Sequence, residues 1–174
     1  MNETMKTLLN RRSVREYRPE QIKDEELNAV LEAGKFAPTG SGKQSPIFIA
    51  VQNREVIQKL AKLNAEVMGV DFNPYYDAPT IILVLVDRNR STAVEDGSLA
   101  LGNMFNAAAS LGLGSCWIHR CKEIFEKEEG KELLRQWGVK EDQYIGVGSC
   151  ILGYPKGELP QADPRKEDYV RFVK

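Results

Sequence analysis

Three arginines near the start of the sequence form the first group that could do chemistry. They stand in the stretch Arg11-Arg12-Ser13-Val14-Arg15. Each guanidinium presents donors in a planar fork that matches the oxygens of a phosphate, and the serine hydroxyl adds another donor. The spacing therefore favours a site for a phosphate group. The alternative is a solvated charge run that pairs with Glu16 and Glu20, and the residue types alone leave both interpretations open.

A glycine-rich tract, P-T-G-S-G-K-Q-S at residues 38–45, suggests a second kind of phosphate site. A nucleotide-binding P-loop has a glycine five positions before the glycine of its Gly-Lys pair, and a Ser or Thr directly after the lysine. Here Ala37 and Gln44 occupy those two positions, and the tract follows a helical pattern instead of a strand. The sequence does not favour a P-loop, although magnesium-dependent ATP binding would revive that interpretation.

The only histidine, His119, lies in the segment C-W-I-H-R-C at residues 116–121. Zinc requires four protein ligands, or three with one open position. In a strand, Cys116 and His119 would point to opposite faces, because side chains alternate along it. No G-x-S-x-G nucleophile elbow accompanies the histidine. We therefore expect no metal site, and we expect the cysteines to be packed in the interior.

The composition excludes several classes of protein. The chain has 174 residues and a formal net charge of −1, so it has no bulk attraction for nucleic acid or for an anionic membrane. No run approaches the roughly 18 apolar residues of a membrane span. Three cysteines are too few for a secreted disulfide scaffold. We expect one domain over residues 1–174 and a cytoplasmic location, without nucleic-acid or membrane partners.

The elements that must position these residues are helices and strands in irregular alternation. Helices are predicted over residues 3–10, 24–34, 54–67, 95–112 and 122–137, and strands over residues 47–51, 80–86, 115–118, 143–152 and 169–173. The run 80–86 is apolar throughout and rich in β-branched residues, which indicates a strand buried on both faces. Because no regular βαβ repeat is visible, the pattern predicts an α+β fold.

The helix predicted over residues 95–112 is apolar nearly all round. A helix without a polar face is buried on more than one side. In a chain this short, such a helix favours a position at the interface of a dimer. A central core helix within a monomer is the alternative.

Together these segments resemble the nitroreductase family of FMN-dependent oxidoreductases, particularly its short members. R-R-S-V-R resembles the family's first flavin motif, and A-P-T-G-S-G-K-Q at 37–44 resembles its loop after the second helix. D-A-P-T-I-I-L-V-L-V at 77–86 is similar to its central strand, and residues 95–118 are the closest match. G-Y-P at 153–155 and P-R-K at 164–166 complete the order. The resemblance implies a central, mainly antiparallel sheet flanked by helices, in a homodimer.

The resemblance also implies which residues contact FMN. The phosphate and ribityl chain would be held by Arg11, Ser13 and Arg15, with Arg165 and Lys166 closing on the same phosphate. Arg12 would lie near the ring system. The glycine-rich loop would touch a flavin bound mainly by the partner subunit, through Pro38, Thr39, Gly40 and Gln44. The segment Trp117, Ile118, His119 and Arg120 would lie beside the reactive edge of the flavin, where an amide N–H could donate to N5.

The implied chemistry is ping-pong transfer of hydride from NAD(P)H through FMN to a nitroaromatic, a quinone or a similar small oxidised acceptor. The cofactor makes and breaks the bonds while the protein supplies position and electrostatics, so no catalytic acid or base is assigned. Other FMN chemistry on the same fold and a non-catalytic flavin-binding protein are the alternatives. No feature of the sequence distinguishes NADH from NADPH.

Two departures from the family's pattern lie near the expected acceptor side. Many members have Asn where this chain has Gly42, and Pro-Trp where it has Ser45-Pro46. The chain also lacks the longer insertions of larger members, so we expect an open pocket. Its ring-stacking walls would be Phe72, Tyr75 and Tyr76, and ordinary packing within the loop is the alternative for these three.

Overall fold

The computed structural model describes all 174 residues and is built around one four-stranded sheet. The strands, in spatial order, are β1 (Pro46–Val51), β2 (Thr80–Asp87), β4 (Tyr144–Gly153) and β3 (Gly114–Ile118). Each neighbouring pair is antiparallel. The helices are α1 (Glu3–Asn10), α2 (Asp24–Lys35), α3 (Arg54–Met68), α4 (Ala93–Ser110), α5 (Cys121–Glu126) and α6 (Glu128–Gln136). The predicted α+β fold with an antiparallel central sheet is confirmed.

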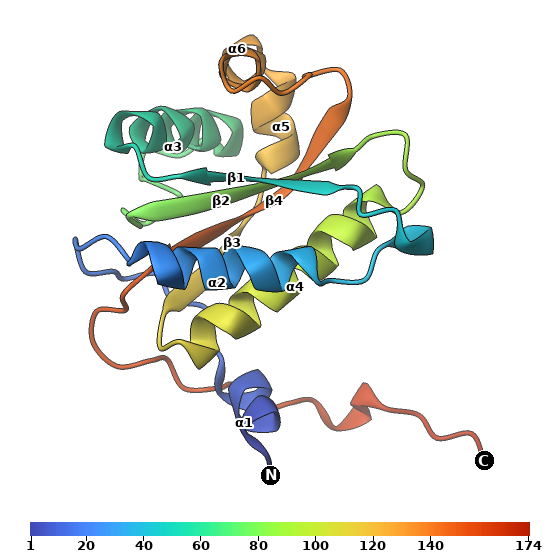
Figure 1. Ribbon diagram of the computed structural model, residues 1–174. Helices are drawn as coiled ribbons and strands as arrows, with labels where there is room; N and C mark the ends of the chain where they lie inside the picture. The colour runs from blue at the N-terminus through green and yellow to red at the C-terminus, as the bar shows by residue number, and fades with distance from the viewer.

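Helices cover both faces of the sheet (Figure 1). The helices α3, α5 and α6 lie on one face, whereas α2 and α4 lie on the other, where α4 packs against all four strands and against α2. Strand β2 shows why both faces are covered. Leu83 and Leu85 face one core, and Ile82 and Val84 face the other. The continuous apolar run is therefore buried on both faces, as the sequence predicts.

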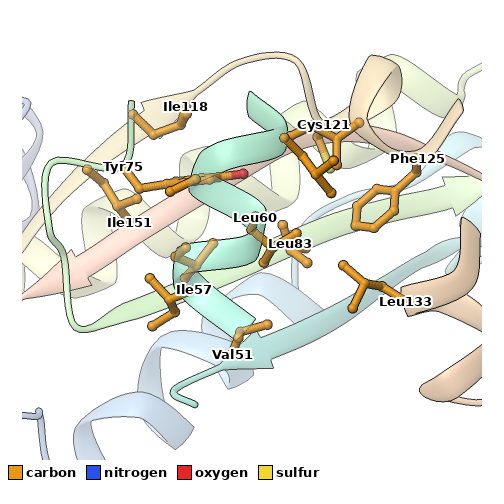
Figure 2. Close-up of a cluster of buried hydrophobic side chains, with 14 of the residues drawn as sticks. Val51, Ile57, Leu60, Tyr75, Leu83, Ile118, Cys121, Phe125, Leu133 and Ile151 are labelled. Carbon is orange, nitrogen blue, oxygen red and sulfur yellow. The ribbon is translucent and has the colours of Figure 1, made fainter. Parts of the chain in front are cut away.

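The larger core lies between the sheet and α3, α5 and α6. Figure 2 shows Tyr75 in this core beside Ile118 and Ile151, and its side chain is fully buried. The prediction that Tyr75 forms a wall of a substrate pocket was wrong, because its ring fills the core instead of facing a pocket. Burial raises the pKa of its hydroxyl to about 12, although the nearby Asn64 and Ser149 side chains counteract part of that effect.

The segment that carries the arginines is joined to the edge of the sheet at β3. Ser13 forms a parallel bridge with Ser115, and the Val14 N–H donates to the Ser115 carbonyl at 3.0 Å. Further along, Tyr17 bridges to Pro155, just beyond the end of β4. These backbone contacts fix the arginine cluster against the sheet.

Two elements differ from the sequence prediction. Residues 122–137 form two helices, α5 and α6, because the backbone of Lys127 between them is extended (φ −74°, ψ 151°). The strand expected over residues 169–173 is wrong: the segment is exposed and has no partner strand, with only a 3₁₀ turn at Glu167–Tyr169. None of the helices combines the length and the apolar character that crossing a membrane would require.

Candidate functional site

The arginine cluster lies beside the C-terminal end of α4. The Arg11 guanidinium lies 5.9 Å from the centroid of the Phe105 ring, and that of Arg15 lies 5.9 Å from the centroid of Tyr76. Arg12 donates from Nη1 to the Leu9 and Arg11 carbonyls at 2.8 and 2.7 Å, while its buried Nε has no hydrogen-bond partner.

None of these three arginines forms an ion pair with a carboxylate, so the alternative of pairing with Glu16 and Glu20 is not observed. Three cationic groups without a counter-charge make this part of the surface attractive to an anion.

A hollow of about 130 Å³ lies next to Arg11 and Arg12. Its other walls come from α1, from Val14, from the end of α4 and the turn after it, and from Pro155 and Leu159 of the C-terminal tail. A larger hollow, about 410 Å³, lies between residues 17–21, the start of α3 and residues 73–79, and none of the predicted cofactor contacts lines it. We place the candidate site at the smaller hollow, because two of the three unpaired arginines, Arg11 and Arg12, line it.

The glycine-rich loop is held at the opposite end of α4. Asp96, in the first turn of that helix, is only 1% exposed, and it accepts hydrogen bonds from the Gly40 N–H at 2.8 Å and the Ser45 hydroxyl at 2.6 Å. The Gln44 N–H donates to the Thr39 hydroxyl at 2.9 Å. A side chain at Gly40 would place its Cβ 2.2 Å from the Thr92 hydroxyl oxygen, so only glycine fits. The loop is therefore pinned, while Pro38 and Gln44 stay exposed.

Asp96 is ionised in this environment. Its burial acts to raise the pKa, but the hydrogen bonds from Ser45 and Gly40, together with the neighbouring Thr92 and Arg90, outweigh that effect. The pKa of Asp96 consequently lies below its ordinary value. A charged carboxylate at the first turn of α4 is also favoured by the helix dipole.

The end of β3 forms the third part of the site. The Trp117 ring lies at 6.4 Å from the rings of both Phe105 and His119, and its indole N–H points to Nδ1 of His119 at 3.4 Å. Ile118 is buried, whereas His119 is exposed. Arg120 follows with a positive φ of 73°, which is unusual for a residue other than glycine.

The remaining predicted residues lie in two places. Phe72 is 47% exposed in the loop before β2, and Tyr76 in the same loop is half-buried under Arg15. Arg165 and Lys166 are exposed in the C-terminal tail, which leads away from α1 in Figure 1, and the Lys166 ammonium lies 4.0 Å from the Asp168 carboxylate. No hydrogen bond joins the tail cations to the arginine cluster within one chain.

The structure thus separates the predicted contacts into two sets along α4. Gly40 packs on Thr92 just before the helix, and Arg11 shares a hollow with Ala109 at its far end. Seventeen residues at 1.5 Å each separate these two positions by about 25 Å. One chain does not gather both sets around one small ligand.

Two residues that hold the site together, Asp96 and Asn64, were not found by sequence reasoning. Both are buried polar residues on the buried faces of their helices. Asn64 donates to the His119 carbonyl and accepts from Arg120, which ties α3 to the end of β3. The position of Asn64 in the sequence could have indicated its role. It follows Leu60 by one helical turn on the apolar stripe of α3, where a buried polar side chain needs hydrogen-bond partners.

Comparison with known proteins identifies the family to which the chain belongs. Residues 8–71 and 70–154 match the model of the nitroreductase family. A nitroreductase from Bacteroides fragilis, solved with bound FMN, is 32% identical over the full length of both chains, with a TM-score of 0.92. An FMN reductase [NAD(P)H] of Bacillus subtilis is 31% identical, covering 98% of this chain and 76% of its own. A protein of Archaeoglobus fulgidus, provisionally named NADH dehydrogenase/NAD(P)H nitroreductase, is 34% identical, covering 95% of this chain and 94% of its own. The chain belongs to the nitroreductase family.

Proposed function

We propose that residues 1–174 form one FMN-binding domain and that the protein is an FMN-dependent oxidoreductase. It passes hydride from NAD(P)H through FMN to a small oxidised acceptor such as a nitroaromatic or a quinone. The observation that carries this proposal is the group of three arginines without counter-charges, two of which line a hollow, in a chain whose structural relative from Bacteroides fragilis was solved with bound FMN.

In this proposal the arginine cluster holds the FMN phosphate. Arg11, Ser13 and Arg15 bind the phosphate and ribityl chain, since guanidinium groups donate to two phosphate oxygens at once. Arg12 lies near the ring, and its buried Nε, which has no partner in the chain, offers a donor there. FMN supplies the hydride-accepting chemistry when it is bound. The protein residues bind and orient it, and no side chain is assigned as a catalytic acid or base.

We infer that the working protein is a homodimer in which α4 lies at the interface. The exposed apolar side chains of α1 and α4, among them Leu8, Leu9, Val94 and Leu99, favour a covered face. A two-fold axis that crosses α4 would set its N-terminal end beside the C-terminal end of the partner's α4. Pro38, Thr39, Gly40 and Gln44 would then meet a flavin held mainly by the other subunit.

The tail and the loop before β2 would complete the pocket. Arg165 and Lys166 close on the phosphate in this proposal, which the unpaired charge of Arg165 and the open course of the tail favour. Phe72 and Tyr76 form ring-stacking walls for the acceptor. The three cysteines are unpaired, which agrees with a reducing, cytoplasmic location.

The deciding experiment is the absorbance spectrum of the purified protein, followed by anaerobic addition of NADH and then NADPH. We expect a flavin spectrum that bleaches with a nicotinamide and returns when a quinone or nitroaromatic is added. A flavin spectrum that neither nicotinamide bleaches would point to a non-catalytic flavin-binding protein. A colourless protein that takes up no added FMN would refute the proposal.

A further inference from the structure

We propose that Asn64 is a positioning residue that fixes the peptide between His119 and Arg120, so that the Arg120 amide N–H faces out of the fold as a donor to the flavin. This inference rests on the proposed function and deepens it, since it names the group that holds the backbone at the reactive edge of FMN.

Asn64 is fully buried in α3 and has two hydrogen bonds to the end of β3. Its Nδ2 donates to the His119 carbonyl at 3.2 Å, and its Oδ1 accepts from Nε of Arg120 at 2.8 Å. A carbonyl can only accept and a guanidinium can only donate. The two partners therefore determine which way the Asn64 amide points.

The bond to the His119 carbonyl sets the direction of the whole peptide unit. In a planar trans peptide the C=O and the following N–H point in opposite directions. Because the His119 carbonyl faces the buried Asn64, the Arg120 N–H is directed away from the core. Neither the His119 N–H nor the Arg120 N–H has an acceptor within the chain. A free donor thus follows directly after the exposed His119, whose ring stacks on the half-buried Trp117.

The backbone at Arg120 needs such a support. A residue other than glycine at positive φ is strained, and it persists only where its surroundings enforce it. Turning the peptide over would return Arg120 to a negative φ, so the bond from Asn64 is what holds it, and it would direct the His119 carbonyl outward in place of the Arg120 N–H. A ring nitrogen with a lone pair accepts from an N–H and is repelled by a carbonyl oxygen. Asn64 therefore selects the orientation that suits an acceptor atom on the flavin.

Three variants separate the two bonds of Asn64. Asn64→Asp keeps an acceptor for the Arg120 guanidinium but removes the donor to the His119 carbonyl. Arg120→Gly removes the guanidinium bond, keeps the donor from Asn64 and tolerates the positive φ. Asn53→Ala removes the N-cap of the same helix, where Asn53 accepts from the Val56 N–H, and has no contact with residues 118–120.

Two measurements are made, one on the protein with FMN bound and one that compares the protein with and without FMN. The ¹⁵N resonance of FMN labelled at N5 reports the donor at that atom, and amide exchange at residue 120 is followed with and without FMN. In the wild type, Arg120→Gly and Asn53→Ala, we expect one common N5 resonance and exchange slowed about twofold to tenfold by FMN, the range that corresponds to one ordinary hydrogen bond. In Asn64→Asp we expect a displaced resonance and no slowing.

The outcomes distinguish this inference from the proposed function. Asn64→Asp that binds FMN with the wild-type N5 resonance and the wild-type protection would overturn it. Failure of FMN to slow exchange at Arg120 in the wild-type holoprotein would overturn it as well, whether or not the variants fold. If the wild type takes up no FMN, the proposed function itself fails, and the role of Asn64 fails with it.

Discussion

The buried carboxylate of Asp96 gives the sharpest prediction about how the glycine-rich loop is held. Its two oxygens accept from the Gly40 N–H and the Ser45 hydroxyl at 2.8 and 2.6 Å. Asp96→Asn keeps the shape and one acceptor, but it removes the charge that both donors address. Hydrogen bonds to charged groups contribute about 1.5–3 kcal/mol each, against about 0.5–1.5 kcal/mol for neutral ones.

Asp96→Asn replaces two charge-assisted hydrogen bonds by weaker neutral ones, but an amide costs less to bury than a carboxylate. We therefore expect a loss of about 1–2 kcal/mol in the free energy of unfolding. Asp96→Ala leaves both donors without an acceptor and should lose about 3–5 kcal/mol. Urea unfolding at pH 7 measures both values. The control is Asp142→Asn, an exposed carboxylate without a hydrogen-bond partner, for which we expect a change within about 0.5 kcal/mol.

The pH dependence provides a second check on Asp96. Its pKa is lower in the folded chain than in the unfolded chain, so the unfolded state binds the proton first. The stabilisation is therefore fully present above the ordinary aspartate value of about 3.9 and is lost as the pH falls through the folded pKa. The gap between wild type and Asp96→Asn should be constant from pH 5 to 8 and should shrink only below about pH 4. Equal unfolding free energies at pH 7 would refute this account of the loop.

Three further predictions concern the cofactor, the interface and a close contact. Arg11→Ala should weaken FMN binding by about tenfold to a hundredfold, the loss of one or two charge-assisted bonds, in a flavin fluorescence titration. Gly102→Glu, at an open position of α4, should leave the monomer folded but weaken self-association in sedimentation, whereas Gly102→Ala should not. Gly130→Ala should lower the free energy of unfolding by more than about 2 kcal/mol, because its Cβ would lie 2.0 Å from the Ile124 carbonyl oxygen. A higher thermal unfolding temperature than that of the wild type would contradict this.

Gly130 shows why sequence patterns reach the elements but not every contact. From the sequence, a glycine inside a helix is a weak point, and alanine would be expected to add about 0.5–1 kcal/mol. In the structure, Gly130 lies in the first turn of α6, directly against the last turn of α5, so the close approach of the two backbones requires glycine there. The chain direction changes at Lys127, where no proline or glycine marks the break. Periodicity therefore predicted one helix where packing produces two.

The strands were predicted well because burial on both faces leaves a strong trace in the sequence. The run over β2 is apolar at every position from Ile81 to Val86, and this pattern needs no knowledge of partners. The C-terminal stretch Tyr169–Val173 is also mostly apolar, with Arg171 as its one charged residue, yet it pairs with neither edge of the sheet, and Ser13 already bridges to the edge at β3. Local propensity cannot report whether an edge is free.

The sequence pointed to candidate site residues only where charge or glycine marked them. The arginines and the glycine-rich loop are recognisable by residue type. Asp96 and Asn64 instead act through hydrogen bonds to backbone groups far along the chain, which the sequence does not reveal. The prediction for Tyr75 was wrong because the sequence of a loop does not show whether an aromatic ring in it lines a pocket or fills a core. Distances between elements, not residue types, decide such cases.

The separation of the two contact sets along α4 links cofactor binding to assembly. If the arginines of one subunit and the loop of its partner enclose one flavin, as we propose, each subunit alone presents an incomplete site. A ligand that binds the assembled form better than the separate subunits stabilises the assembly, and the assembly strengthens binding by the same factor. Gly102→Glu, although it touches none of the predicted flavin contacts, should then lower FMN affinity in proportion to the loss of dimer. An unchanged affinity in the dissociated variant would mean that one chain holds the flavin alone, and that the loop pinned by Asp96 has another role.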